Sequence, residues 1–262
     1  MKKLFQKMLK WVLWHSPYAI QDFAVECWLK YSGYLRDENR FWEVIKQTKA
    51  FRELNASSVY VDCGVNFGSV ANAFIKKGVT AYLFEPLLQC FSFLQRKFGS
   101  NAKVHLYNKA VGDRAGKMPF YTPPQENGDV SLWKLECASF DRLRDNALNT
   151  MMEVDVIDFC DFLEKLNTPV DFLKMDIEGA EYPILEKMIA TGVYKKIHHC
   201  FVFAHADCVN NGLFDEADAR VRELITQHQI SNIYLLYMDH VFPAWPVDWK
   251  LKGGYDNLSA AS

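Results

Sequence analysis

The chain has 262 residues, of which 50% are hydrophobic and 24% are charged, and its formal net charge is −2. This length can bury one sizeable core with a small helical accessory, and this composition excludes a largely disordered chain. The nearly balanced charge provides no global field that would favour nucleic acid, so no nucleic-acid partner is expected.

The seven cysteines are scattered along the chain, and none of them stands in a C-x-x-C pair. This pattern argues against a zinc site. It is typical of free thiols in a reducing compartment, so a cytoplasmic location is expected.

Residues 1–50 are predicted to form an N-terminal helical extension. Its first 17 residues carry apolar side chains at nearly helical spacing, which predicts an amphipathic helix packed on the main domain. Lysines interrupt the apolar run and no small-residue cleavage site follows, so a signal peptide is not expected. The alternative is a weak contact with the inner face of a membrane, through four lysines and two tryptophans.

Residues 59–69, with the sequence VYVDCGVNFGS, open the main domain. β-Branched and aromatic residues predict a buried strand that ends at Asp62. Gly64 and Gly68 then bracket a turn that contains Asn66, and a helix follows. A glycine turn between a strand and a helix is typical of a cofactor site, because the backbone can approach a ligand there. The G-x-x-x-G spacing lacks the third glycine of a pyrophosphate cradle, which favours a cofactor without phosphates; a purely structural turn is the alternative.

A second strand is predicted at residues 81–84 and ends at Glu85 and Pro86. An acidic residue about 20 positions after the first loop commonly binds the hydroxyl groups of a ribose, since a carboxylate can accept from both of them. The alternative is a capping or exposed glutamate. A third strand, at residues 104–107, ends at Asn108.

Residues 114–157 interrupt the alternation of strands and helices. A short strand at 118–121, loop signals, and an alternating segment at 153–156 predict a small antiparallel insertion beside the cofactor site. It is a candidate for substrate choice, or a plain β-meander.

The alternation resumes with strands at 170–175, 200–204 and 233–237 and an amphipathic helix at 214–228. The whole pattern predicts an α/β fold with a mostly parallel central sheet and helices on both faces. We expect this domain to span residues 51–252, followed by a flexible tail at 253–262. Ligands bind beyond the carboxyl ends of such strands, so one edge of the sheet should gather Asp62, Glu85, Asn108, Asp176 and His205.

Four segments resemble motifs of the FkbM family of S-adenosylmethionine (SAM)-dependent methyltransferases: VDCGVNFG at 61–68, FEP at 84–86, NKAVGD at 108–113 and FLKMDIEGAEYPIL at 172–185. The resemblance implies a Rossmann-like class I methyltransferase fold with SAM as cofactor. It places cofactor contacts at Asp62, Gly64, Asn66, Gly68, Glu85, Pro86, Asn108, Ala110 and Asp176. The chain departs from the family pattern at Val65, where alanine is usual, and at Phe203, where many members carry glutamate.

Methyl transfer to a hydroxyl group requires a group that removes the hydroxyl proton. The candidate catalytic residues are Lys174, Asp176, Glu178 and His205. His205 is expected to titrate near neutrality and to act as the base, with Asp176 orienting it, binding the acceptor or contacting the cofactor. For Lys174 the alternative is a structural ion pair. Asp176, Glu178, His205 and Asp207 could instead hold Mg²⁺ or Mn²⁺.

The resemblance further implies that the acceptor is a sugar hydroxyl, in a glycan, a glycolipid or a glycosylated metabolite. Three alternatives stay open: an NAD or nucleotide-sugar enzyme, which the missing glycine opposes; a catalytically impaired SAM-binding scaffold, which Phe203 favours; and a metal-assisted methyltransferase that acts on a non-sugar small molecule. The sequence leaves the oligomeric state open.

Overall fold

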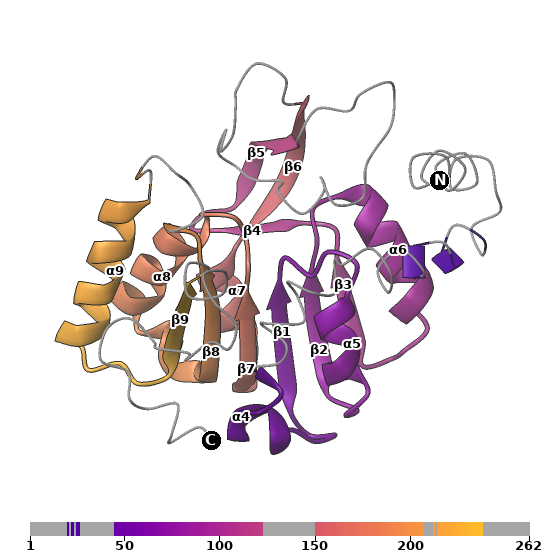
Figure 1. Ribbon diagram of the computed structural model, residues 1–262, viewed down its shortest axis with the longest axis horizontal. Helices are drawn as coiled ribbons and strands as arrows, with labels where there is room; N and C mark the ends of the chain where they lie inside the picture. Colours follow the sequence, from indigo (N-terminus) through magenta and orange to yellow (C-terminus); the bar gives the residue numbers. More distant parts are fainter. Residues whose placement is uncertain are drawn as a thin grey trace, which may run out of the picture.

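The computed structural model describes residues 20, 22, 23, 25, 26, 45–122, 150–206, 212 and 214–237. At its centre is a six-stranded sheet of parallel pairs in the order β3-β2-β1-β7-β8-β9 (Figure 1). The chain builds β2 and β3 on one side of β1 and continues with β7 on the other, so the strand order reverses between β1 and β7. Open α/β sheets bind ligands at such a reversal. The strands are β1 (Val59–Cys63), β2 (Thr80–Phe84), β3 (Val104–Tyr107), β7 (Val170–Met175), β8 (Ile197–Ala204) and β9 (Ile233–Tyr237).

The register of the strands brings the predicted site residues to one edge of the sheet. Cys63 pairs with both Phe84 and Met175, and Phe84 pairs in turn with Tyr107. Since these strands are parallel, the residues that follow them leave the sheet on the same side. They are Gly64, Glu85, Asn108, Asp176 and, after β8, His205.

Helices cover both faces of the large sheet, which confirms the predicted fold class. Tyr60 and Phe172 belong to the core on one face, and Val61 and Leu173 belong to the core on the other. The first face packs against α4 (Lys49–Arg52), α5 (Ser69–Ile75) and part of α6 (Leu88–Phe98). The second packs against α7 (Phe159–Lys165), α8 (Glu181–Thr191) and α9 (Asp215–Gln227), and the 3-10 helix η2 (Val193–Lys196) precedes β8.

Stacked aromatic rings fix the relative positions of the central strands. The ring of Tyr60 stacks on Phe74 of α5 with centroids 3.8 Å apart, and Phe201 stacks on both Phe172 and Tyr234 at 4.7 Å. Such pairs contribute about 0.5–1.5 kcal/mol each beyond the area they bury. The strands that carry the site residues are therefore held rigidly.

A second, three-stranded sheet lies beyond the carboxyl ends of the large sheet, at the top of Figure 1. It consists of β4 (Ala110–Gly112), β5 (Gly116–Thr122) and β6 (Thr150–Asp158). The strands β5 and β6 form the predicted antiparallel pair, but β4 joins β6 in parallel, so the small sheet is mixed. Its core includes Phe120 and Val154, together with Phe67 of the loop after β1 and Phe93 of α6. This packing ties the small sheet to the candidate cofactor loop.

Part of the predicted N-terminal extension contacts α6. The five described residues between 20 and 26 are helical. Arg96 donates two hydrogen bonds to Asp22, at 2.6 and 2.7 Å, and Lys97 pairs with Glu26 at 3.0 Å. The remainder of residues 1–44 lies outside the described residues, as do the tail and the segment at 241–247.

Two further observations bear on the expected surroundings of the protein. The described cysteines, Cys63, Cys90, Cys160 and Cys200, are buried thiols that form no disulfide bond, as the sequence suggested. Within the described part of the chain, no helix is long and apolar enough to cross a membrane.

Candidate active site

The glycine loop after β1 is packed tightly against the end of β7. Gly64 has a φ of +82°, and a Cβ atom built on it would lie 2.0 Å from the backbone oxygen of Asp176. The room that this glycine provides is thus taken by the neighbouring strand. Gly68 has a φ of +74°, and a Cβ there would meet Leu94 and Phe98 at 2.8 and 2.9 Å. Gly68 therefore lets the start of α5 approach α6.

Four backbone N–H groups of the loop donate hydrogen bonds within the protein. Those of Gly64 and Val65 both donate to the Phe84 carbonyl, at 3.1 and 3.2 Å. The N–H of Asn66 donates to Glu85 Oε2 at 2.8 Å. The N–H of Gly68 donates to the Val65 carbonyl at 2.8 Å.

Glu85 and Asn108 hold the end of β2 in place. Glu85 is only 4% exposed, and its Oε1 accepts from the Leu87 N–H at 2.8 Å while Oε2 accepts from Asn66. Burial raises the pKa of Glu85 to about 7. The two backbone N–H donors favour the carboxylate and lower the pKa, but their effect is smaller than that of burial. The Asn108 side-chain amide donates to the carbonyls of Glu85 and Pro86 at 3.0 and 2.9 Å. Asn66, Glu85 and Asn108 thus form one group of polar residues beside the loop.

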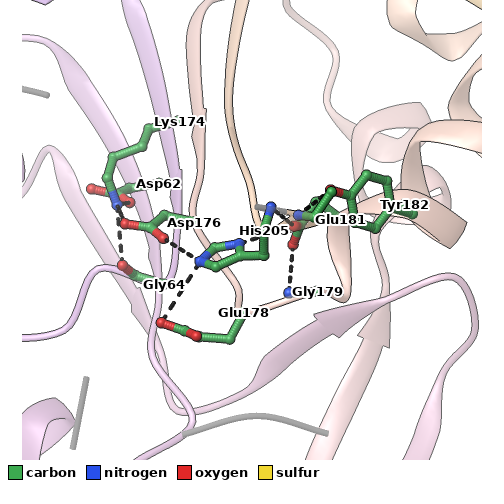
Figure 2. A network of polar contacts seen from close by, with 10 residues as sticks. Asp62, Gly64, Lys174, Asp176, Glu178, Gly179, Glu181, Tyr182 and His205 are labelled. Carbon is green, nitrogen blue, oxygen red and sulfur yellow. Dashed lines mark hydrogen bonds and ion pairs between the residues drawn. The ribbon is translucent and has the colours of Figure 1, made fainter. Parts of the chain in front are cut away.

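Asp62 and Lys174 form a buried ion pair next to Gly64 of the loop (Figure 2). The Lys174 Nζ lies 3.2 Å from Asp62 Oδ1, 3.2 Å from the Gly64 carbonyl and 3.6 Å from Asp176 Oδ2. The Tyr60 hydroxyl donates to Asp62 Oδ2 at 2.6 Å. Burial raises the pKa of Asp62, although the Lys174 charge and the Tyr60 hydroxyl oppose this. The ion pair that was the alternative for Lys174 is therefore present.

His205 lies at the centre of a cluster of three carboxylates (Figure 2). Its Nδ1 is 2.9 Å from Oε1 of Glu181, which is fully buried, and its Nε2 faces Asp176 Oδ1 at 3.6 Å and Glu178 Oε1 at 3.7 Å. Glu178 reaches this position with a φ of +54°, a strained conformation that is common at functional sites.

The charges around His205 correct one expectation from the sequence. Burial alone would lower the pKa of His205, but the carboxylates of Glu181, Glu178 and Asp176 outweigh burial and raise the pKa to about 10. The expectation that His205 titrates near neutrality is therefore wrong. With no other cation beside Nε2, the ring is therefore protonated at pH 7, and it acts as a hydrogen-bond donor rather than as a base.

Among the described residues, the predicted site residues thus form two adjoining groups, and Ala110 stands apart from both. Ala110 is buried in β4 as part of the small-sheet core. Asp207 lies outside the described residues. Phe203 lies beside the cluster, with its ring centroid 5.8 Å from that of His205.

Sequence reasoning missed how strongly Glu181 and Tyr60 support these groups. Glu181 is not among the site residues expected from the sequence, yet it accepts from the backbone N–H of His205 at 3.1 Å and from that of Gly179 at 2.9 Å. An available signal was the glutamate three residues after Glu178 in EGAE, in a segment that follows a buried strand.

The order of the strands and the polar groups at their carboxyl ends define a Rossmann-like α/β fold, which is a fold that methyltransferases adopt. The model of the methyltransferase FkbM domain matches residues 62–202, which is more than half of the chain. The chain therefore belongs to the FkbM methyltransferase family. No curated protein matches it.

Proposed function

We propose that the protein transfers a methyl group from SAM to a hydroxyl group, and that this hydroxyl belongs to a sugar in a glycan, a glycolipid or a glycosylated metabolite. The internal use of the loop N–H groups carries the cofactor part of the proposal. A dinucleotide needs free N–H groups to bind its pyrophosphate, whereas the N–H groups of Gly64, Val65 and Asn66 already donate within the protein. A cofactor without phosphates has no such requirement.

Two side chains near the loop fit a polar cofactor. The Ser69 hydroxyl, in the first residue of α5, is buried and has no hydrogen-bond partner among the described residues. A buried hydroxyl without a partner is costly, so a ligand that bonds to it is favoured. Each Glu85 oxygen accepts one backbone N–H, and a carboxylate offers about four acceptor positions. Glu85 can therefore still accept from ribose hydroxyls.

When bound, SAM supplies a methyl group on a positively charged sulfur. The protein must then hold the acceptor and take its proton. The side chains of Asp176 and Glu178 are 34% and 25% exposed, whereas that of His205 is 4% exposed and favours the protonated form. We assign contact with the acceptor hydroxyl and its proton to these two carboxylates, and we assign their positioning to His205.

The sugar part of the proposal rests on the family and on the chemistry of the same carboxylates. Carboxylates accept hydrogen bonds from neighbouring hydroxyl groups more strongly than neutral side chains do. Asp176 and Glu178 face the same ring nitrogen of His205, so they can bind two hydroxyl groups of one sugar.

The test measures binding first and transfer second. We expect SAM and S-adenosylhomocysteine to raise the melting temperature of the full chain and NAD to leave it unchanged. SAM with a radiolabelled methyl group should then transfer its label to a fraction that contains sugar acceptors. The label should survive treatment with base, because methylation of a hydroxyl group forms an ether. Stabilisation by NAD alone would refute the proposal, and cofactor binding without transfer to any glycan would favour the scaffold.

A pair of variants separates the acceptor group from the cofactor site. Asp176→Asn should lower transfer by about 10²-fold or more, the range for a general base, while the protein still binds S-adenosylhomocysteine. Asp155→Asn is the control, because Asp155 is exposed on β6. If both variants lose transfer equally, the role of Asp176 is refuted.

A further inference from the structure

The Nε2 atom of His205 is buried and points into a group of oxygens without bonding to any of them. His205 is 3% exposed. In the described part of the chain its Nε2 makes no hydrogen bond, and the carboxylate oxygens that face it, from Asp176 and Glu178, lie 3.6 and 3.7 Å away. Figure 2 shows both carboxylates directed at this one nitrogen.

These distances are long for an imidazolium that bonds to a carboxylate. A charge-assisted N–H···O bond is about 2.7–2.9 Å long, so a proton alone would draw one carboxylate in. Instead the two oxygens stand at nearly equal distances. Atoms that bind one metal ion at about 2.0–2.2 Å each are held apart in this way. The three ligand atoms lie within 4.8 Å of one another, so a small inward rotation of the carboxylates would close the site.

The other nitrogen of His205 is oriented as metal-binding histidines require. A ligating histidine usually donates its second N–H to a carboxylate, which fixes the tautomer and strengthens the ligand. Nδ1 of His205 lies 2.9 Å from the fully buried Glu181, which the N–H groups of His205 and Gly179 hold in place. With a proton on Nδ1, the lone pair of Nε2 points at the two carboxylates.

We propose that Asp176, Glu178 and His205 bind a divalent first-row transition-metal ion, with Glu181 holding His205 in the ligating tautomer. Two carboxylates and one imidazole form a mixed oxygen and nitrogen donor set. Carboxylates suit Mg²⁺, Ca²⁺ and Mn²⁺, whereas imidazole suits Zn²⁺, Fe²⁺ and their neighbours. An ion that accepts both donors, such as Mn²⁺, fits better than Ca²⁺.

The role of the ion in catalysis rests on the proposed function, but its binding does not. At this position it would offer open coordination sites to an acceptor oxygen and lower the pKa of that hydroxyl group. Cation binding and cofactor binding can therefore fail separately.

The test titrates Mn²⁺ into the full chain after dialysis against a chelator and follows free Mn²⁺ by electron paramagnetic resonance. We expect about one bound Mn²⁺ per chain, with a nitrogen coupling in the spin-echo spectrum that reports the imidazole. Glu178→Gln should weaken binding more than about tenfold, and Glu181→Gln should weaken it about 10–100-fold through His205. The control is Glu153→Gln, the same change at a side chain that is 62% exposed.

Each outcome has one meaning for the proposal. Circular dichroism first shows that the variants are folded. Of the site variants, Glu178→Gln should disturb folding least, because the Glu178 side chain is partly exposed. No Mn²⁺ binding, or binding without nitrogen coupling, or equal binding by Glu178→Gln and Glu153→Gln, would overturn it. S-adenosylhomocysteine binding by the same samples reports on the proposed function: if it persists without Mn²⁺ binding, only the metal site is refuted.

Discussion

Replacing Lys174 by methionine should destabilise the protein far more than the same replacement at the surface. The side chains of Lys174 and Asp62 are 5% and 1% exposed, and their charges lie 3.2 Å apart. Removing one partner of a buried pair costs about 3–5 kcal/mol, because the other charge stays buried without compensation. The total free energy of unfolding of a protein domain is only about 5–15 kcal/mol. Lys174→Met should therefore remove a large share of it.

The chain offers a matched control. Lys117 pairs with Glu153 at 3.1 Å, but these side chains are 66% and 62% exposed. Exposed pairs contribute about 0–1 kcal/mol. Lys117→Met therefore removes an ion pair of nearly the same length without leaving a buried charge, and should cost less than about 1 kcal/mol.

The assay is urea unfolding at pH 7.5, followed by circular dichroism. The double variant Asp62→Asn/Lys174→Met removes both charges, and the amide oxygen that replaces the Asp62 carboxylate can still accept from the Tyr60 hydroxyl. It should be about 2 kcal/mol more stable than Lys174→Met alone, since neighbouring groups couple by about 0.5–3 kcal/mol. Equal losses in Lys174→Met and Lys117→Met, or a double variant no more stable than Lys174→Met, would refute the reasoning.

Two further predictions concern Gly64 and Glu85. Gly64→Ala should unfold at lower urea than Gly192→Ala, because both glycines have φ near +80° but only the Cβ at Gly64 meets an atom, 2.0 Å away, with nothing within 4 Å at Gly192; equal midpoints would contradict this. Since the pKa of Glu85 is raised from 4.5 to about 7, the folded state holds more protons than the unfolded state between these values. This stabilisation is present below pH 4.5 and is lost as pH rises through about 7, by up to about 3 kcal/mol. The difference in unfolding free energy between wild type and Glu85→Gln should follow that window, and a constant difference from about pH 5 to about pH 8 would refute it.

The sequence predicted the central sheet well because buried parallel strands are continuous apolar runs that end in polar residues. The predicted strands at 170–175 and 233–237 have the bounds observed for β7 and β9. The small sheet was less predictable. β4 has only three residues, Ala110–Gly112, and its parallel pairing with β6 joins segments more than 40 residues apart. A run this short carries no periodicity.

The site residues were predicted by position, but their interactions were not. Each of the decisive contacts joins distant parts of the chain: Asp62 to Lys174 across 112 residues, and Glu181 to His205 across 24. Sequence spacing shows which polar groups reach one edge of the sheet, since strand ends are recognisable. It does not show that Lys174 lies next to Gly64 of the loop, or that three carboxylates surround one histidine and shift its pKa.

The network as a whole places Asp176 between two positive charges. Along it the charges alternate, from Asp62 to Lys174 at 3.2 Å, to Asp176 at 3.6 Å, to His205 at 3.6 Å and to Glu181 at 2.9 Å. The two ends are almost fully buried, whereas the Asp176 side chain in the middle is 34% exposed. Lys174 faces one oxygen of Asp176 and His205 faces the other, so the carboxylate is oriented before any substrate arrives, which is how preorganised sites lower barriers. This alternation of charges requires a positive charge at Nε2 of His205, which either a proton or the proposed metal ion supplies.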